Sequence, residues 1–332
     1  MEPEIKNRYN NHILAEARQR FGIAPDQIKL LDGFESYMYE FEKDDSEFIL
    51  RIGHSRRRSP DMIRGEVDWI NYLAKGGAGV ARAVESAQGN LVEIIPDAKD
   101  GAFLATAFVK APGADAWTAG WWGEDWFAEY GRLLGKMHRL TKSYKPAKLE
   151  WNRSSWDAPE NLEIEEHIPE SISFVSEKFR ELMQHLQSLP TGPEDYGMIH
   201  QDAHGGNFFV DENGKITLFD FDDCTYGHFA YDVAMVLFYA VTNREDAEEF
   251  APIFWRPFWQ GYCEENELDP KWLCEIPHFL KLREIDMIAV LYRSCDMDNL
   301  DDPWIKAFMN GRLDRIANDV PYIKDTTFLL DN

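Results

Sequence analysis

The sequence predicts an α+β fold with two lobes, a strand-rich N-terminal lobe at residues 1–110 and a mainly helical C-terminal lobe at residues 111–332. Short β-like runs between turn residues dominate the first lobe, whereas longer segments with helical spacing dominate the second. Ala111-Pro112-Gly113 interrupts both patterns and therefore marks the expected boundary. A small β element within the helical part carries the polar residues that are the candidates for chemistry.

The N-terminal elements follow from apolar spacing and from turn residues. Residues 3–21 have helical spacing, and Gly22 is the expected stop. Pro60 is expected to begin a second helix, which Gly76 ends. The expected strands lie at residues 28–31, 37–42, 47–52, 90–95 and 103–110.

The C-terminal elements are expected to be helices around one small β element. That element would consist of residues 198–199, 208–210 and 216–219, with a turn at Asn213-Gly214. The expected helices lie at residues 125–140, 231–240, 247–264, 272–294 and 304–316, with one or two more within residues 160–188.

The composition excludes several classes of protein. The formal net charge is −24, from 35 basic and 59 acidic residues, which argues against a nucleic-acid partner because such binding depends on neutralising phosphates. An acidic field attracts cationic substrates, although the charge could equally serve solubility alone. No apolar run approaches the roughly 20 residues that a membrane span needs. We expect no secretory signal, because the first residues lack a basic stretch followed by an apolar one, and four dispersed cysteines favour a reducing cytoplasm.

The most informative segment runs from His200 to Asp223. Asp202 is followed five residues later by Asn207, and Asp220 stands at the end of a β-like run. This spacing is typical of the kinase catalytic loop H-R-D-x-x-x-x-N followed by D-F-G. Asp202 is the candidate general base, Asn207 and Asp220 are candidate Mg²⁺ ligands, and Asp222 is expected to help position metal or substrate. Taken singly, each could be an ordinary turn residue.

The first lobe contains candidate contacts to the phosphates of a nucleotide. Gly33 and Ser36 lie in a turn between two β-like runs, where backbone N–H groups can approach phosphates, although an ordinary hairpin would look the same. Arg51 occupies the strand position where a kinase places its phosphate-pairing Lys, and Glu66 on the next helix is its expected partner. The run 56–58 of three arginines could reach anionic groups, but such a run is usually a solvated loop.

Three further features have both a structural and a functional interpretation. His200 is expected to pack and to hydrogen-bond the catalytic loop. Asp232 begins an apolar helix, complements its dipole and is expected to brace the same loop. Tryptophans at 117, 121, 122 and 126 could cage a ligand or could belong to the core.

These residues resemble the aminoglycoside phosphotransferase and choline kinase family, which has the protein-kinase-like fold. The likeness rests on His200-x-Asp202-x-x-x-x-Asn207, on 219–223 and on 231–234, with looser matches in the first lobe. It implies that ATP and Mg²⁺ are used to phosphorylate a hydroxyl, usually of a small molecule. It also implies that Asp202 is the base, that Asn207 and Asp220 hold metal, and that Arg51 and Glu66 clamp phosphate. Gln201 and the lack of a proline in the loop depart from the common pattern.

The leading hypothesis is therefore a small-molecule kinase whose acceptor is polar or cationic; the sequence leaves ATP and GTP open as donors. A protein Ser/Thr kinase of the same fold is the first alternative, but no activation segment with an A-P-E-like end follows Asp220. A non-catalytic pseudokinase is the second. Asp202, Asn207 and Asp220 argue against it, whereas Arg in place of Lys at residue 51 leaves it open.

Overall fold

The computed structural model describes residues 3–31, 33, 35–162 and 164–331. The chain forms two compact units, of which the first comprises residues 1–113, 144–153 and 217–222, and the second comprises the remainder. An antiparallel sheet in the first unit and helices in the second confirm the predicted α+β class.

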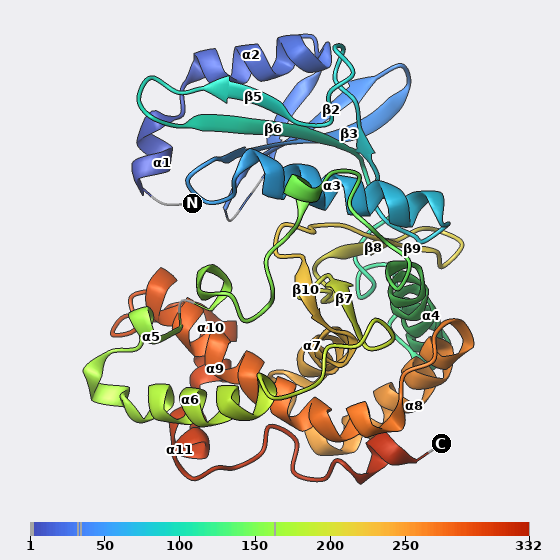
Figure 1. The fold of residues 1–332 in the computed structure, drawn as a ribbon, viewed down its shortest axis with the longest axis vertical. Coiled ribbons are helices and arrows are strands. Elements are labelled where there is room, and N and C mark those ends of the chain that lie inside the picture. The colour runs from blue at the N-terminus through green and yellow to red at the C-terminus, as the bar shows by residue number, and fades with distance from the viewer. Residues whose placement is uncertain (1–2, 32, 34, 163, 332) are drawn as a thin grey trace. The chain divides into compact units, whose positions relative to one another are not determined.

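The first unit is built on a sheet with the order β1-β2-β3-β6-β4, and β5 also pairs with β6. All of these pairings are antiparallel. Figure 1 shows its elements before residue 110 in blue to teal and η1 in green. They are α1 (Pro3–Arg8), α2 (Asn11–Phe21), β1 (Ile28–Leu31), β2 (Tyr37–Lys43), β3 (Ser46–His54), α3 (Pro60–Lys75), β4 (Ala83–Val84), β5 (Glu93–Pro96), β6 (Ala102–Val109) and the 3₁₀ turn η1 (Leu149–Trp151).

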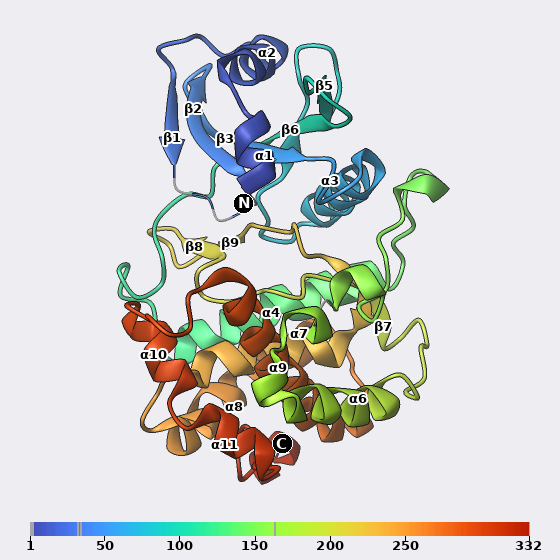
Figure 2. The same cartoon turned by 90° about the vertical axis from the view of Figure 1, so that its left-hand side faces the viewer.

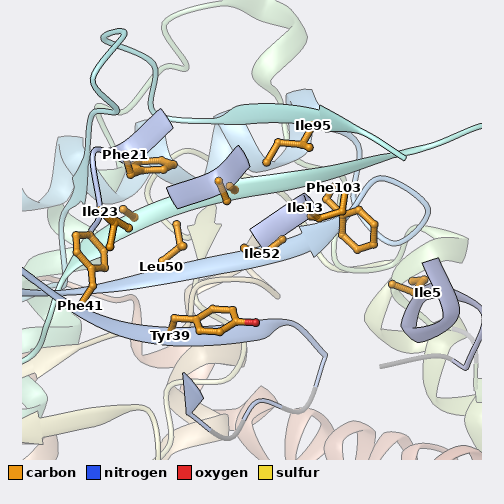
Figure 3. Close-up of a cluster of buried hydrophobic side chains, with 13 residues drawn as sticks. Ile5, Ile13, Phe21, Ile23, Tyr39, Phe41, Leu50, Ile52, Ile95 and Phe103 are labelled. Atoms are coloured by element: carbon orange, nitrogen blue, oxygen red, sulfur yellow. The ribbon is translucent and has the colours of Figure 1, made fainter. Parts of the chain in front are cut away.

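The two faces of this sheet are covered by different helices because side chains alternate along a strand. Phe103 on β6 packs in one cluster with Ile13 and Phe21 of α2, as Figure 3 shows. The adjacent Leu104 packs with Ile63 of α3 in a second cluster. One face of β6 therefore meets α2 and the other meets α3.

Two later segments complete the first unit. The segment 217–222 joins it through a parallel bridge between Leu218 and Val80 and through an edge contact of Phe221 with Trp69. In the segment 144–153, the Tyr144 hydroxyl donates to Asp68 of α3 at 2.8 Å. Residues 220 and 222 consequently belong to the same compact unit as β3 and α3.

The second unit is mainly helical. Strands β7 and β10 form a short antiparallel pair. Within β9, the chain passes from the second unit to the first between Ile216 and Thr217. Helix α6 lies beside α9 and α11, as the two views agree (Figure 1 and Figure 2). The elements are α4 (Glu124–Thr141), η2 (Pro159–Asn161), α5 (Ile164–His167), η3 (Glu170–Ile172), α6 (Phe174–Leu186), β7 (Tyr196–Ile199), β8 (Phe208–Val210), β9 (Ile216–Leu218), β10 (Thr225–His228), α7 (Phe229–Val241), α8 (Ala247–Glu265), η4 (Pro270–Glu275), α9 (Ile276–Ser294), α10 (Pro303–Met309), α11 (Arg312–Ala317) and η5 (Thr327–Leu330).

Helices α4 and α8 approach each other at glycines. A Cβ atom on Gly131 of α4 would lie 1.9 Å from the carbonyl oxygen of Phe258, and one on Gly261 of α8 would lie 2.0 Å from that of Ala128. Such distances are far inside van der Waals contact, so only glycine permits this spacing. The two backbones are therefore in direct contact.

Most predicted elements are confirmed, and the exceptions have local causes. The helix expected at 3–21 is two helices, because the side chain of Asn10 accepts hydrogen bonds from the backbone N–H groups of His12 and Ile13 and so begins a new helix. The helix expected at 304–316 is broken at Gly311, whose φ of 65° is left-handed. Strands β4 and β10 were not predicted. Among the described residues, no helix has the length and apolar character needed to cross a membrane.

Candidate active site

The loop that carries Asp202 is held in place by a buried carboxylate. Asp232, in the first turn of α7, accepts hydrogen bonds from the backbone N–H groups of His200 at 2.9 Å and Gln201 at 2.7 Å. Its Oδ2 also lies 3.2 Å from Nε2 of His138 on α4. Gln201 takes a left-handed φ of 68°, a conformation that costs an L-residue free energy and is common at functional loops. The expectation that Asp232 braces the loop is confirmed.

The interior of the second unit fixes the rest of this loop. His200 is fully buried, and its Nδ1 accepts from the backbone N–H of Asp202 at 3.3 Å, which confirms its expected structural role. The hydroxyl of Tyr130 on α4 donates to the carbonyl oxygen of Ala203. Burial lowers the pKa of His138, so this imidazole is neutral at neutral pH and stacks on Phe229.

Replacing Asp232 with Asn should destabilise the second unit by about 1–3 kcal/mol. One carboxamide oxygen can still accept from the loop, whereas its NH₂ group would face a backbone donor and leave that donor unpaired. The free energy of unfolding, measured by urea denaturation, checks this value. Asp211→Asn in the exposed β8–β9 turn is the control for a surface carboxylate, and equal losses in both variants would contradict the bracing role.

Asp202 lies in a cluster of polar side chains, some of which come from helices far away in the sequence. Its Oδ1 accepts from Nη2 of Arg283 on α9 at 2.7 Å and from the hydroxyl of Tyr239 on α7 at 3.2 Å. Its Oδ2 lies 3.4 Å from Nε2 of His204. Burial raises the pKa of Asp202, but Arg283 and the histidines outweigh burial and bring the pKa to about 2. The carboxylate is therefore ionised at neutral pH.

Asn207 is oriented by the same carboxylate. Its Nδ2 donates to the backbone oxygen of Asp202 at 2.9 Å and lies 3.2 Å from Oδ2 of that residue. The amide nitrogen therefore faces Asp202, and the carbonyl oxygen is left to serve as a ligand. The structure thus brings together two of the predicted site residues in the second unit.

The first unit brings together the predicted phosphate clamp. Arg51 on β3 and Glu66 on α3 form a bidentate ion pair, with Nη1–Oε1 and Nη2–Oε2 distances of 2.8 Å. Both side chains are buried, and the guanidinium lies 5.1 Å from the ring centroid of Phe108. Burial lowers the pKa of Arg51, but Glu66 and Asp222 outweigh burial and raise it above its usual value.

Asp220 and Asp222 have contrasting surroundings in the first unit. Asp220 is exposed, has a left-handed φ of 62°, and raises the pKa of Arg51 electrostatically. Asp222 is buried against arginines. Burial raises the pKa of Asp222, but Arg57, Arg51 and Arg58 hold it well below its usual range.

The turn that contains Gly33 and Ser36 also belongs to this part. Ser36 lines a small pocket with Arg51, Arg57 and Asp222. A Cβ atom on Gly33 would lie 2.2 Å from the carbonyl oxygen of Ser36, so the turn requires glycine there. Phe34 of the same turn lies outside the described residues.

The tryptophans divide between core and surface. Trp126 is 3% exposed and belongs to the core, whereas Trp117 is 53% exposed. The ring of Trp117 stacks on Trp122 with centroids 4.6 Å apart. It also lies against Gly205 of the loop that carries Asp202, where a Cβ atom would be 2.1 Å from the ring. An exposed aromatic surface thus adjoins the loop that carries Asp202.

Several partners of the predicted residues were not found from the sequence. Arg283 and Tyr239 contact Asp202 from helices whose apolar spacing gives no sign of a functional polar residue. The partly buried positions of Arg57 and Arg58 contradict the expectation of a solvated run, with side chains only 22% and 13% exposed. One feature of the sequence could have indicated that Arg57 and Arg58 lie near phosphate: they follow directly on the strand that carries Arg51, itself a candidate phosphate ligand.

Comparisons with known proteins agree over nearly the whole chain. Residues 26–269 match the phosphotransferase enzyme family. The amicoumacin kinase of Bacillus subtilis (strain 168) is 40% identical over 317 residues, which cover 94% of each chain. The solved structure of amicoumacin kinase hAmiN in complex with AMP-PNP, Ca²⁺ and Ami is 37% identical and has a TM-score of 0.92, covering 98% of this chain and 99% of that one.

A more distant structure agrees in fold alone. The microcompartment-associated aminopropanol kinase has a TM-score of 0.74 at 21% identity, covering 94% of this chain and 98% of that one.

Proposed function

Because this chain belongs to the phosphotransferase enzyme family and is an ATP-dependent kinase of small molecules, we propose that its acceptor is amicoumacin or a compound of that kind. The membership bears out the resemblance and the protein-kinase-like fold expected from the sequence. The observation that carries the proposal is the 40% identity to the Bacillus subtilis enzyme over 94% of both chains. The protein-kinase and pseudokinase alternatives are not favoured.

We propose that Asp202 orients the acceptor hydroxyl and receives its proton as the γ-phosphate is attacked. Its support is the ionised carboxylate of Asp202, on a loop whose backbone N–H groups at His200 and Gln201 donate to Asp232. Positioning of this kind supplies much of the catalysis in phosphoryl transfer, because the enzyme contributes little covalent chemistry. Arg51, braced by Glu66, would hold phosphate oxygens in the manner of the usual Lys.

The solved structure of amicoumacin kinase hAmiN contains AMP-PNP and Ca²⁺, which supports binding of a nucleotide and a divalent metal by this chain, and we propose Mg²⁺ as the metal. Asn207 fits this role because its amide nitrogen is engaged by Asp202 while its oxygen remains a hard donor. Asp220 fits because it is an exposed acidic residue two positions after strand β9. The metal would neutralise charge on the phosphates when bound. Asp222 differs from these two because arginines surround its carboxylate.

An Asp220→Ala variant should bind Mg·AMP-PNP at least tenfold more weakly than the wild type, because one anionic metal ligand is lost. Titration calorimetry with and without Mg²⁺ checks this. The Mg²⁺-dependent part of the affinity should fall, while the affinity for metal-free nucleotide should not. Equal affinities of variant and wild type in the presence of Mg²⁺ would count against the metal role.

The acceptor is tested directly by phosphate transfer. Purified protein with Mg·ATP is incubated with amicoumacin, an aminoglycoside, a small amino alcohol and a generic protein substrate, and ADP release and the mass of each product are measured. The expected result is one added phosphoryl group on amicoumacin and ADP release that depends on it. Transfer to the aminoglycoside or the amino alcohol alone would reassign the acceptor within the family.

The surface of Trp117 offers a second test of the acceptor. This exposed ring lies against Gly205, three residues after Asp202, and is therefore a candidate contact for an acceptor held at the base. Trp117→Ala should raise the KM for the acceptor and leave the KM for ATP unchanged, whereas the exposed Trp304 provides the matched control.

A further inference from the structure

The carboxylate of Asp222 is surrounded by guanidinium groups of the first unit. Nη1 of Arg51 lies 3.7 Å from its Oδ1, and Nε of Arg58 lies 3.8 Å from its Oδ2. Nη1 of Arg57 contacts the same Oδ2 more closely. Arg153 donates from Nη2 to the backbone oxygen of Asp222 at 2.6 Å. The buried carboxylate of Asp222 thus forms ion pairs with three arginine side chains, and a fourth arginine hydrogen-bonds to the backbone of the same residue.

These arginines line a pocket rather than a solvated loop. The pocket is formed by Ser36 of the β1–β2 turn, by β3 and by the residues that follow β3. The turn after β3 is fixed because the backbone N–H groups of Arg57 and Arg58 donate to the carbonyl oxygen of His54 at 3.0 and 3.3 Å. Glu35 forms an ion pair with Arg57 from the other wall. Both arginines therefore face the same pocket as Arg51.

Arg56 shows that this arrangement is specific to two members of the arginine run. Its side chain is 40% exposed and pairs with Glu4 at 2.6 Å and Asp100 at 3.6 Å, away from Asp222. It therefore has the same charge and nearly the same sequence position as Arg57, but different surroundings. Arg56 is the natural control for any experiment on its neighbours.

We propose that Arg57 and Arg58 bind the phosphate groups of the nucleotide together with Arg51, and that Asp222 occupies this anion site until phosphate displaces it. The inference rests on the proposed kinase function and extends the phosphate contacts to two residues outside the clamp. Guanidinium groups bind phosphate and carboxylate oxygens with the same forked geometry, so the carboxylate of Asp222 can take the place of a phosphate. The ligand class is an oligophosphate.

The exchange has a consequence for Asp222 itself. A divalent cation beside three guanidinium groups would be repelled, so this arrangement is suited to an anion. Once phosphate oxygens take over the arginines, the carboxylate of Asp222 is released from them. Before binding, the carboxylate of Asp222 compensates the positive charge of the arginines. The nucleotide has to displace this carboxylate, so it binds more weakly than it would to a site without Asp222.

The experiment measures binding of inorganic tripolyphosphate in buffer that contains EDTA, and of Mg·AMP-PNP, by titration calorimetry. The variants are Arg57→Gln, Arg58→Gln and, as the matched control, Arg56→Gln. We expect the first two to weaken both ligands about tenfold or more, because each loses a charged hydrogen bond, and the control to bind as the wild type does. Asp222→Asn should bind tripolyphosphate more tightly than the wild type.

The outcomes separate this inference from the proposed function. Wild-type affinity in both Arg57→Gln and Arg58→Gln, with normal binding of Mg·AMP-PNP, would overturn the anion site and leave the kinase intact. Failure of the wild type to bind Mg·AMP-PNP would overturn both. Tripolyphosphate that AMP-PNP cannot displace would show an anion site separate from the nucleotide, which contradicts the proposal. Thermal unfolding identifies variants that fail to fold, and Arg57→Lys and Arg58→Lys then provide charge-preserving substitutes.

Discussion

An Asp202→Asn variant should transfer phosphate about 10²–10⁴-fold more slowly than the wild type, and it should bind Mg·AMP-PNP with nearly unchanged affinity. The carboxamide keeps an oxygen that can accept from Arg283, so the loop retains its shape. It cannot receive the proton of the acceptor hydroxyl or orient that hydroxyl as an anionic acceptor does. The loss should therefore appear in kcat, while calorimetry reports an intact nucleotide site.

The control for this variant is Glu212→Gln, which neutralises an exposed acid in the β8–β9 turn of the same segment. It should have the kcat of the wild type. An Asp202→Asn enzyme that turned over at the wild-type rate would show that Asp202 is not the base. A variant that lost both turnover and nucleotide binding would instead point to a collapsed loop.

Replacing Arg283 with Met should lower kcat and move the acidic limb of the pH–rate profile to higher pH. In the wild type, burial raises the pKa of Asp202. The positive charge of Arg283 is the largest effect that lowers it, and the resulting pKa is about 2. Without Arg283, burial raises the pKa of Asp202 and a larger fraction is protonated in mild acid. Asp286, whose pKa burial already raises, would lose its 2.7 Å contact to the same guanidinium.

Arg283→Met should also lower the free energy of unfolding, and the size of this loss should depend on pH. The folded pKa of Asp202 is depressed, so its contribution to stability is present above the unfolded value, about 3.9, and is lost as the pH falls through about 2. The side chains of Arg283 and Asp202 are 13% and 21% exposed, so removing the cation should cost at most the roughly 3–5 kcal/mol of a fully buried pair at neutral pH. Arg283→Lys keeps the charge and should retain most of the wild-type pH profile. An unshifted acidic limb in Arg283→Met would contradict the electrostatic role.

The sequence predicted those parts of the site that are encoded locally. Asp202 and Asn207 are five residues apart on one loop, so their spacing specifies their contact. Arg51 and Glu66 are 15 residues apart, yet a strand followed by a helix is regular enough to bring them together. In both cases the chain between the partners has a geometry that can be read from its pattern.

The parts that were not predicted depend on tertiary packing. Arg283 lies 81 residues beyond Asp202 on a helix that shows only core spacing, and its contact arises from the way α9 packs on α7. Strand β4 has two residues and carries too little alternation to be recognised. The break at Asn10 depends on a capping hydrogen bond that competes with an otherwise continuous helical pattern.

The glycine contact between α4 and α8 lies next to a residue that supports the loop carrying Asp202. Tyr130, which holds the carbonyl oxygen of Ala203, precedes Gly131, where the backbone of α4 rests on that of α8. Side chains can accommodate a small displacement by changing rotamer, but two backbones in direct contact cannot adjust in this way. We therefore expect a shift of α8 to displace Tyr130 and, through its hydrogen bond, Ala203, the residue next to Asp202. We expect added bulk at Gly131 or Gly261 to separate the two helices and so to displace the loop that carries Asp202.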